Sequence, residues 1–194
     1  MIFETVKQTV AAARSYRSFD PSRPIEYETM RELVDAARYC PSAANLQPLK
    51  YRIVAGDEAD AVLPLTRWAG YLREIKLPPE GKAPTGYIVI LHDTSVSPET
   101  DYSKMDVGIA AEVIMLAAAE LGYGGCMIGS FDRDGLKDAL SIPEGLTPVL
   151  TLALGTPDET VFITDLRDGD IKYFRDDRGL HFVPKRSLEE VIIK

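Results

Sequence analysis

The sequence feature that most constrains this fold is a long segment, residues 104–121, whose hydrophobic period favours a single helix. Its apolar face is wide and rich in alanine, which lets a second helix approach closely. Gly122 directly follows it and is typical of a residue that ends a helix. The apolar stretch 107–121 contains Glu112 and Glu120 and is too short to span a bilayer, so we expect a helix inside a protein core.

Other helices and strands surround this helix in an irregular order. Helices are predicted over 2–16, 26–39, 59–66 and 133–141, and strands over 51–55, 87–91, 126–129 and 148–155. Because strict strand–helix alternation is missing, we predict an α+β fold, a single domain with a central sheet and helices on both faces. The residues after about 160 predict a hairpin-like arm around a turn at 176–179, followed by a short amphipathic end at 188–193.

Charge and cysteine content exclude several classes of protein. The chain of 194 residues has 22 Lys and Arg against 30 Asp and Glu, and this net charge of −8 disfavours nucleic acids and anionic membranes as partners. Cys40 and Cys126 are too few for a disulfide scaffold, and the first residues lack the apolar region of a signal peptide. Neither histidine stands in a metal-ligand pattern. We therefore expect a cytoplasmic protein without a metal site.

A basic cluster near the start opposes this overall charge. The segment 13–17, ARSYR, places Arg14 and Arg17 around the hydroxyl of Ser15 within about one helical turn. Two guanidinium groups beside a hydroxyl suit a phosphate group, because each guanidinium can bind it through two hydrogen bonds. The alternative is a solvated helix end, where cations offset the negative end of the helix dipole. Taken alone, the pattern favours this alternative.

Three further segments carry residues suited to small molecules. The loop 41–48, PSAANLQP, holds a hydroxyl and two amides between prolines, and amides suit polyol and uracil-like edges. Gly129 and Ser130 end a predicted strand, where small residues let a flat ligand approach backbone N–H groups. Lys185 and Arg186 form a second basic cluster. Taken singly, these segments are also typical of a turn, a strand end and plain surface.

Common catalytic motifs are missing from the sequence. The glycine-rich segment 122–129 is not a dinucleotide fingerprint, because its third glycine position falls on Met127 and it follows a helix and precedes a strand. The chain has no GxxxxGK phosphate loop and no GxSxG nucleophile elbow. Cys126 lies on a predicted buried strand, where a thiol is typically inert. We therefore predict no catalytic side chain.

Five segments, in this order and spacing, resemble the nitroreductase family of FMN-dependent oxidoreductases. They span nearly the whole chain: 14–19 (RSYRSF), 37–48 (ARYCPSAANLQP), 106–112 (DVGIAAE), 128–132 (IGSFD) and 183–186 (VPKR). The resemblance implies a mostly antiparallel central sheet flanked by helices. It also implies a homodimer, in which the arm from about residue 160 packs on the partner subunit, with one FMN at each of two sites between the subunits.

The resemblance assigns a role to each basic residue singled out above. It implies that Arg14 and Ser15 hold the flavin phosphate and ribityl chain, and that Arg17 reaches the pyrimidine edge of the ring. It implies further phosphate contacts from Lys185 and Arg186. Ala13 stands where many family members have another arginine, so one phosphate contact is lost or comes from elsewhere.

The loop and the strand end also gain roles from the resemblance. Pro41, Ser42 and Asn45 belong to a loop that, in the family, reaches the flavin of the other subunit. Gly129 and Ser130 match the positions that offer backbone N–H groups near flavin N5. Residues 60–104, which often shape the substrate side in the family, match no motif.

The activity implied is transfer of a hydride from NADH or NADPH through flavin N5 to a nitroaromatic, a quinone or a similar electrophile, by a ping-pong mechanism. FMN carries this chemistry, which agrees with the missing catalytic motifs. Two alternatives remain: an FMN-binding protein for flavin storage or sensing with little turnover, and a specialised reductase or dehydrogenase on the same fold.

Overall fold

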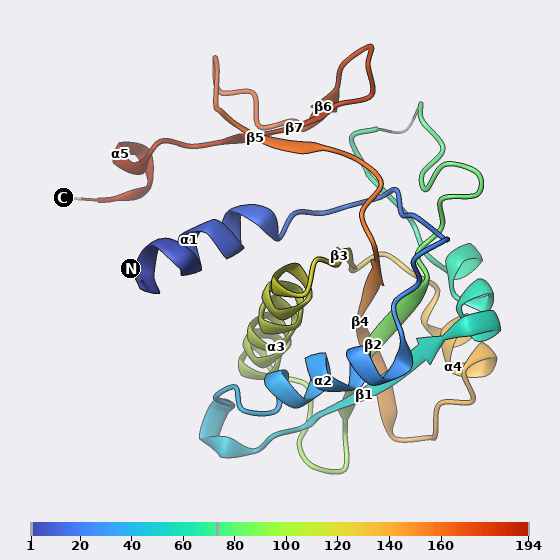
Figure 1. Cartoon of the computed structure of the whole chain (residues 1–194). Helices are drawn as coiled ribbons and strands as arrows, with labels where there is room; N and C mark the ends of the chain where they lie inside the picture. The colour runs from blue at the N-terminus through green and yellow to red at the C-terminus, as the bar shows by residue number, and fades with distance from the viewer. Residues whose placement is uncertain (1, 73, 194) are drawn as a thin grey trace.

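Four antiparallel strands form the centre of the molecule in the computed structural model, which describes residues 2–72 and 74–193 (Figure 1). The strand order is β1-β2-β4-β3, and every neighbouring pair is antiparallel. Their bounds are β1 (Leu49–Ala55), β2 (Gly86–Asp93), β3 (Gly124–Ile128) and β4 (Leu146–Gly155). The antiparallel central sheet predicted above is confirmed, and β3 lies at its edge.

Helices cover both faces of this sheet, as predicted. Successive side chains of a strand point to opposite faces. Ile88 and Ile90 of β2 therefore pack with α2 (Tyr27–Ala37) and α3 (Asp101–Glu120). Tyr87 and Val89 pack on the other face with α4 (Arg133–Ala139) and the short 3-10 turns η2 (Gly56–Ala61) and η3 (Leu63–Leu65). The predicted helix over 59–66 is thus replaced by two 3-10 turns.

The long helix α3 has clear signals at both ends. Thr100 accepts a hydrogen bond from the backbone N–H of Ser103, and the Ser103 hydroxyl accepts one from the backbone N–H of Thr100. This reciprocal pair satisfies two backbone donors that a helix start leaves free. Gly122 follows the helix with a φ of +80°, a left-handed conformation that favours glycine. No helix in the described residues is long and apolar enough to cross a membrane.

The first helix, α1 (Ile2–Ala12), ends four residues before the predicted position. The chain leaves the helix because residues 15 and 16 pair with the start of β3, where the Tyr16 N–H donates to the Gly125 carbonyl oxygen at 2.8 Å. Pairing with a distant strand therefore overrides the local helical pattern.

The residues after 160 form an arm with a small sheet of its own. Its strands are β5 (Val161–Asp165), β6 (Phe174–Arg175) and β7 (His181–Lys185), and α5 (Leu188–Val191) follows. The predicted hairpin is confirmed as the antiparallel pair β6–β7, but β5, which pairs with β7 in parallel, was not predicted. In Figure 1 the arm lies above α1, away from the helices that cover the central sheet.

Candidate functional site

The segment after α1 lies against the first residues of β3. Tyr16 packs so closely on Gly124 that a Cβ there would collide with its ring, so this position requires glycine. The Arg14 guanidinium donates to the Val10 carbonyl oxygen at 2.5 Å, and its buried Nε has no hydrogen-bond partner in the part of the chain that the structure describes. Ser15 is exposed beside it. Arg14 thus neutralises the end of α1 and keeps a donor for a ligand.

Arg17 is buried, with 8% of its surface exposed, and its surroundings come from distant parts of the chain. Its backbone N–H donates to Glu159, and its guanidinium donates to the Ser15 carbonyl oxygen at 3.2 Å. The guanidinium carbon lies 4.8 Å from the centre of the Tyr173 ring, a cation–π distance. The Nε of Arg17 is buried, and no described residue is its hydrogen-bond partner. A buried guanidinium with an unused donor is suited to an acceptor atom of a ligand.

Glu159 lies at the centre of these contacts. One carboxylate oxygen accepts from the Arg17 N–H, and the other accepts from Arg175 and lies 3.8 Å from His181 Nδ1. Burial acts to raise the pKa of Glu159, but His181, the Arg17 N–H and the Arg175 charge outweigh it and hold the pKa below its ordinary value. Glu159 is therefore ionised at neutral pH, with its negative charge beside the Arg175 guanidinium and the Arg17 backbone N–H.

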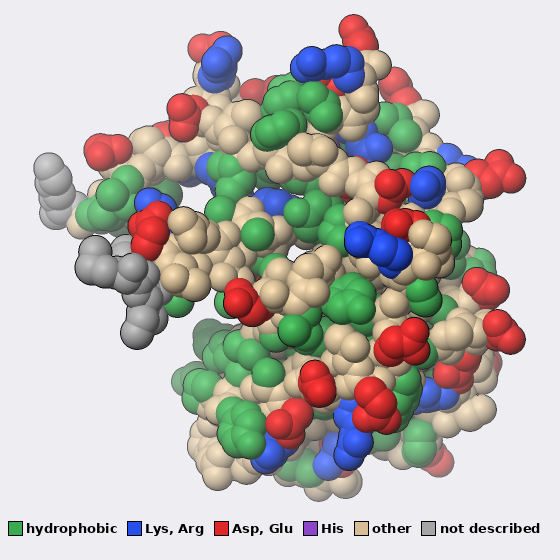
Figure 2. Space-filling model, viewed as in Figure 1, with side chains coloured by type: hydrophobic (Ala, Val, Ile, Leu, Met, Phe, Trp, Pro, Cys, Tyr) green, Lys and Arg blue, Asp and Glu red, His purple; other side chains and the backbone are tan. Residues whose placement is uncertain are grey.

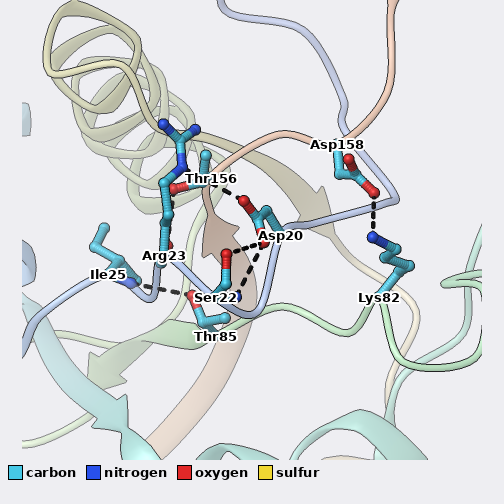
Figure 3. A network of polar contacts seen from close by, with 8 residues as sticks. All are labelled: Asp20, Ser22, Arg23, Ile25, Lys82, Thr85, Thr156 and Asp158. Carbon is cyan, nitrogen blue, oxygen red and sulfur yellow. Dashed lines mark hydrogen bonds and ion pairs between the residues drawn. The ribbon is translucent and has the colours of Figure 1, made fainter.

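The chain beyond Arg17 is fixed by a second network, drawn in Figure 3. The Asp20 N–H donates to the Thr156 carbonyl oxygen at 2.9 Å, and the Thr156 hydroxyl donates to the Arg23 carbonyl oxygen at 2.8 Å. Lys82 and Asp158 form an ion pair at 2.6 Å beside them. These two hydrogen bonds hold residues 17–25 and 156–159 side by side, which fixes the position of Arg17, whereas the exposed Lys82–Asp158 pair is of the surface kind that contributes little.

The end of β3 is open to a ligand. Gly129 and Ser130 are exposed, and a Cβ on Gly129 would have no atom within 4 Å. The Ser130 carbonyl oxygen accepts from the Arg67 N–H at 2.9 Å, which ties this loop to residues 66–68. Cys126 lies on β3 itself, and burial raises the pKa of its thiol, so it fits the predicted inert core thiol. The RSYR segment and the Gly129–Ser130 loop therefore lie at opposite ends of the same edge strand.

The loop 41–48 is held by a residue that the sequence analysis did not assign to the site. The Asp106 carboxylate accepts from the Ser42 hydroxyl at 2.6 Å and from the Ala43 N–H at 3.1 Å. The Ser42 hydroxyl in turn accepts from the Gln47 N–H at 3.0 Å. Pro41 and Ser42 line a cavity of about 230 Å³ with Asp106, while Asn45 is exposed with a φ of +55°. Asp106 opens one of the five segments of the resemblance, which was the available signal.

Within a single chain, the loop 41–48 lies far from Arg14 and Arg17. Asp106, which holds the loop, lies near the start of α3, whereas the RSYR segment meets the chain just after the end of α3. At 1.5 Å per residue, the fourteen steps from Asp106 to Glu120 place these two ends about 21 Å apart. The two halves of the predicted site thus lie at opposite ends of one helix.

The second basic cluster, Lys185 and Arg186, lies at the end of β7. Lys185 and Arg186 are exposed, and Arg186 forms an ion pair with Glu190 at 3.4 Å. Within the described ranges, no hydrogen bond or ion pair connects either residue to Arg14 or Arg17.

Sequence reasoning missed the residues that fix Arg17. Glu159, Tyr173, Arg175 and His181 lie 142 to 164 positions after it, and no local pattern joins them. The mixed charge of the last 35 residues was the available signal, because Arg175 and His181 lie there and the arm buries their side chains.

Comparisons with known proteins identify the family. Residues 10–156 match the profile described as the nitroreductase family. The chain is 29% identical over 169 residues to a Methanothermobacter thermautotrophicus protein, provisionally named an NADH dehydrogenase/NAD(P)H nitroreductase, with 85% of this chain and 84% of that protein covered. It is 25% identical over 204 residues to the 4-nitrobenzoate reductase of Pseudomonas putida, covering 81% and 88%.

Solved structures have the same fold. A nitroreductase family protein of Streptococcus pneumoniae has a TM-score of 0.71 at 16% identity, with 97% of this chain and 98% of that chain covered. A provisionally named nitroreductase of Desulfovibrio desulfuricans, solved in complex with FMN, has a TM-score of 0.68 at 19% identity, covering 97% and 95%. With the match to the family profile over most of its length, this chain belongs to the nitroreductase family.

Proposed function

We propose that this protein is an FMN-dependent oxidoreductase that uses NADH or NADPH to reduce a nitroaromatic, a quinone or a similar electrophile in two alternating half-reactions. The observation that carries the proposal is the edge of β3, which has arginines with unused buried donors at one end and an open glycine loop at the other. A relative named 4-nitrobenzoate reductase and a solved relative with FMN support it.

The residues at this edge fit FMN. Among residues 2–72 and 74–193, the buried Nε atoms of Arg14 and Arg17 have no hydrogen-bond partner, so each guanidinium has a donor available for a ligand oxygen. Ser15 is exposed beside them, and Gly129 leaves open space at the other end of the strand. We assign the phosphate and ribityl chain to Arg14 and Ser15, and the pyrimidine edge of the ring to Arg17. Gly129 and Ser130 would offer backbone N–H groups to the ring.

When bound, FMN would accept two electrons from the nicotinamide and deliver them to the acceptor. The task of the protein is then to bind, orient and tune. Arg17 holds a fixed positive charge in a buried setting, where electrostatic interactions are stronger than in water. That charge would favour the reduced, anionic form of the ring. No side-chain acid or base is assigned to the reaction.

We propose that the working unit is a homodimer. Pro41, Ser42 and Asn45 belong to a loop held near the start of α3, and the arginines lie near its other end, about 21 Å along the helix, so we infer that the two sets meet at one cofactor when they come from different subunits. Large hydrophobic side chains are also exposed on α1, α3 and α5, among them Val6, Met105 and Leu188. Figure 2 shows hydrophobic side chains gathered on the arm at the top of the view. An interface between copies would cover such surfaces.

The same dimer would bring Lys185 and Arg186 close to a phosphate of either subunit. Sedimentation of the purified protein is expected to give a mass of about two chains of 21.4 kDa. A monomer at micromolar concentration would contradict the assignment of residues 41–45 to the site. The cytoplasmic location stays a prediction.

The activity is tested by loading the purified protein with FMN and measuring oxidation of NADH and NADPH with menadione or nitrofurazone. We expect turnover, and we expect Arg17→Ala to weaken FMN binding. Arg23→Ala is the matched control, because Arg23 lies in the same segment but pairs with Asp20 at the surface. A protein that binds FMN without turnover would instead be a flavin storage or sensing protein. A protein that takes up no FMN would contradict both functions.

A further inference from the structure

Glu159 connects parts of the chain that are far apart in sequence. It follows β4, accepts from the Arg17 N–H after α1, and accepts from Arg175 in β6 of the arm. His181 of β7 lies 3.8 Å from the same carboxylate and is fully buried. A single side chain thus joins the segment that bears Arg17 to two strands of the arm.

Because these charged side chains are buried, losing one of their contacts is energetically costly. The side chains of Glu159 and Arg175 are 4% and 12% exposed. Removing one partner of a buried charge pair leaves the other charged group without compensation, which is strongly unfavourable. The positions of Arg17 and of the arm relative to each other are therefore expected to depend on the Glu159 carboxylate.

Aromatic contacts extend the link to the other end of β3. The Tyr173 ring lies under the Arg17 guanidinium and 5.5 Å from the His181 ring. Tyr71 contacts Tyr173 at 5.1 Å between ring centres, and residues 66–72 are tied to Ser130 through the Arg67 N–H. The arm therefore contacts both the Arg17 segment and the chain that holds the Gly129–Ser130 loop.

We infer that Glu159 is a positioning residue that fixes Arg17 and holds the C-terminal arm with the same carboxylate, so that the orientation of Arg17 depends on the placement of the arm. The link between Glu159 and the arm stands without any cofactor. Its effect on FMN rests on the proposed function.

The first test uses the protein without FMN. Amide hydrogen exchange is compared in the wild type, Glu159→Gln and Asp158→Asn. Asp158 is the matched control, because it is the preceding acid and pairs with Lys82 at the surface. We expect Glu159→Gln to speed exchange at Arg17 and in residues 173–185 by about 10- to 100-fold, the loss typical of hydrogen bonds to a charged group. Unchanged exchange, or equal change in Asp158→Asn, would overturn the link to the arm.

The second test measures FMN binding in a double-mutant cycle. We expect Glu159→Gln to raise the FMN dissociation constant by about tenfold in the wild type and to have little effect in Arg17→Ala, because Glu159 acts on FMN only by positioning the Arg17 guanidinium, through the Arg17 backbone N–H and the arm that carries Tyr173. Equal losses in both backgrounds would indicate general destabilisation and overturn the role assigned to Glu159. If the wild type did not bind FMN, only the proposed function would be contradicted, since the hydrogen-exchange test is made without FMN.

The midpoint potential of bound FMN separates two possible effects of Glu159→Gln, because they change the potential in opposite directions. Removing a nearby negative charge would by itself make reduction easier and raise the potential. Displacing the Arg17 cation would make reduction harder and lower it. We expect a lower potential in Glu159→Gln, and a higher one would contradict the positioning role. If Glu159→Gln does not fold, Arg175→Gln tests the arm side of the link by the same exchange measurement.

Discussion

In the central sheet, seven of the eight residues of β2 are buried between helices on both faces, whereas in the arm β5 exposes three of its five residues. Phe162, Ile163 and Phe174 are each more than 40% exposed in the arm. The central sheet is therefore stabilised by apolar burial, while the arm depends on stacked aromatic rings and on the charged contacts of Glu159. Parts of a protein with fewer buried apolar contacts open more easily.

This difference separates global stability from the stability of the candidate site. Arg17 follows residues that pair with β3 of the central sheet, whereas the Tyr173 ring that its guanidinium contacts belongs to the arm. Changes in the central sheet are expected to shift unfolding of the whole chain. Changes in the arm are expected to open the arm locally and to disturb Arg17 first.

The largest effect is expected in the central sheet. Leu152 is fully buried in β4, and Leu152→Ala should lower the free energy of unfolding by about 2–5 kcal/mol, because it leaves a cavity. Urea unfolding followed by circular dichroism measures the loss. Val96→Ala is the control, because Val96 is 40% exposed in a loop, and it should cost far less. Equal losses would mean that the sheet is not the main source of stability.

Acid should weaken the arm through Glu159. The pKa of Glu159 is lower in the folded protein than its ordinary value, so its contribution to stability is present above the unfolded pKa and is lost as the pH falls through the folded pKa. Proteolysis of the arm, followed from neutral pH to below pH ~4, should therefore accelerate on acidification. In Glu159→Gln, this acid-dependent part should shrink. An unchanged pH profile would show that Glu159 does not stabilise the arm.

The junction between the two regions is tested at Gly124. Gly124→Ala places a methyl group against the Tyr16 ring, and such overpacking costs about 1–3 kcal/mol. We expect the loss in thermal unfolding together with weaker FMN binding, because Tyr16 moves with Ser15 and Arg17. For the stability measurement, Gly129→Ala is the control, since a Cβ there meets no atom of the described residues within 4 Å. Stability unchanged in Gly124→Ala would contradict the close packing of residues 15–16 on β3.

The smallest global effect is expected inside the arm. Phe182 stacks with Phe162 and Phe174 at 5.5 and 5.1 Å between ring centres, and each such pair contributes about 0.5–1.5 kcal/mol beyond burial. Phe182→Ala should speed proteolytic cleavage within 160–185 and leave the urea midpoint of the central sheet nearly unchanged. A large shift of that midpoint would show that the arm and the sheet unfold together.

The central sheet was largely predictable from the sequence because its signals are local. The apolar runs around Ile88 and Leu152 predict buried strands, and the alanine-rich run that ends at Gly122 predicts the long helix α3. The boundaries differ where distant pairing decides them. α1 ends at Ala12 because residues 15 and 16 pair with β3.

The arm and the surroundings of Arg17 were less predictable. β5 has no alternating pattern strong enough to show a strand, and it is fixed by parallel pairing with β7. The link from Arg17 to Glu159 is a contact between residues 142 positions apart, which no short motif reports. The candidate binding residues came from the family resemblance, whereas the residues that position them are visible only in the folded chain.

The separation between Arg17 and Glu159 also has a consequence for the order of synthesis. A ribosome adds about 5–20 residues per second, so Arg17 precedes its carboxylate partner by roughly 7–30 s. During that interval the basic segment has helices and strands forming around it, but its partner does not yet exist. The basic segment is thus made well before it can reach its final contacts, and slow or interrupted translation would prolong the time for which it is accessible to chaperones and proteases.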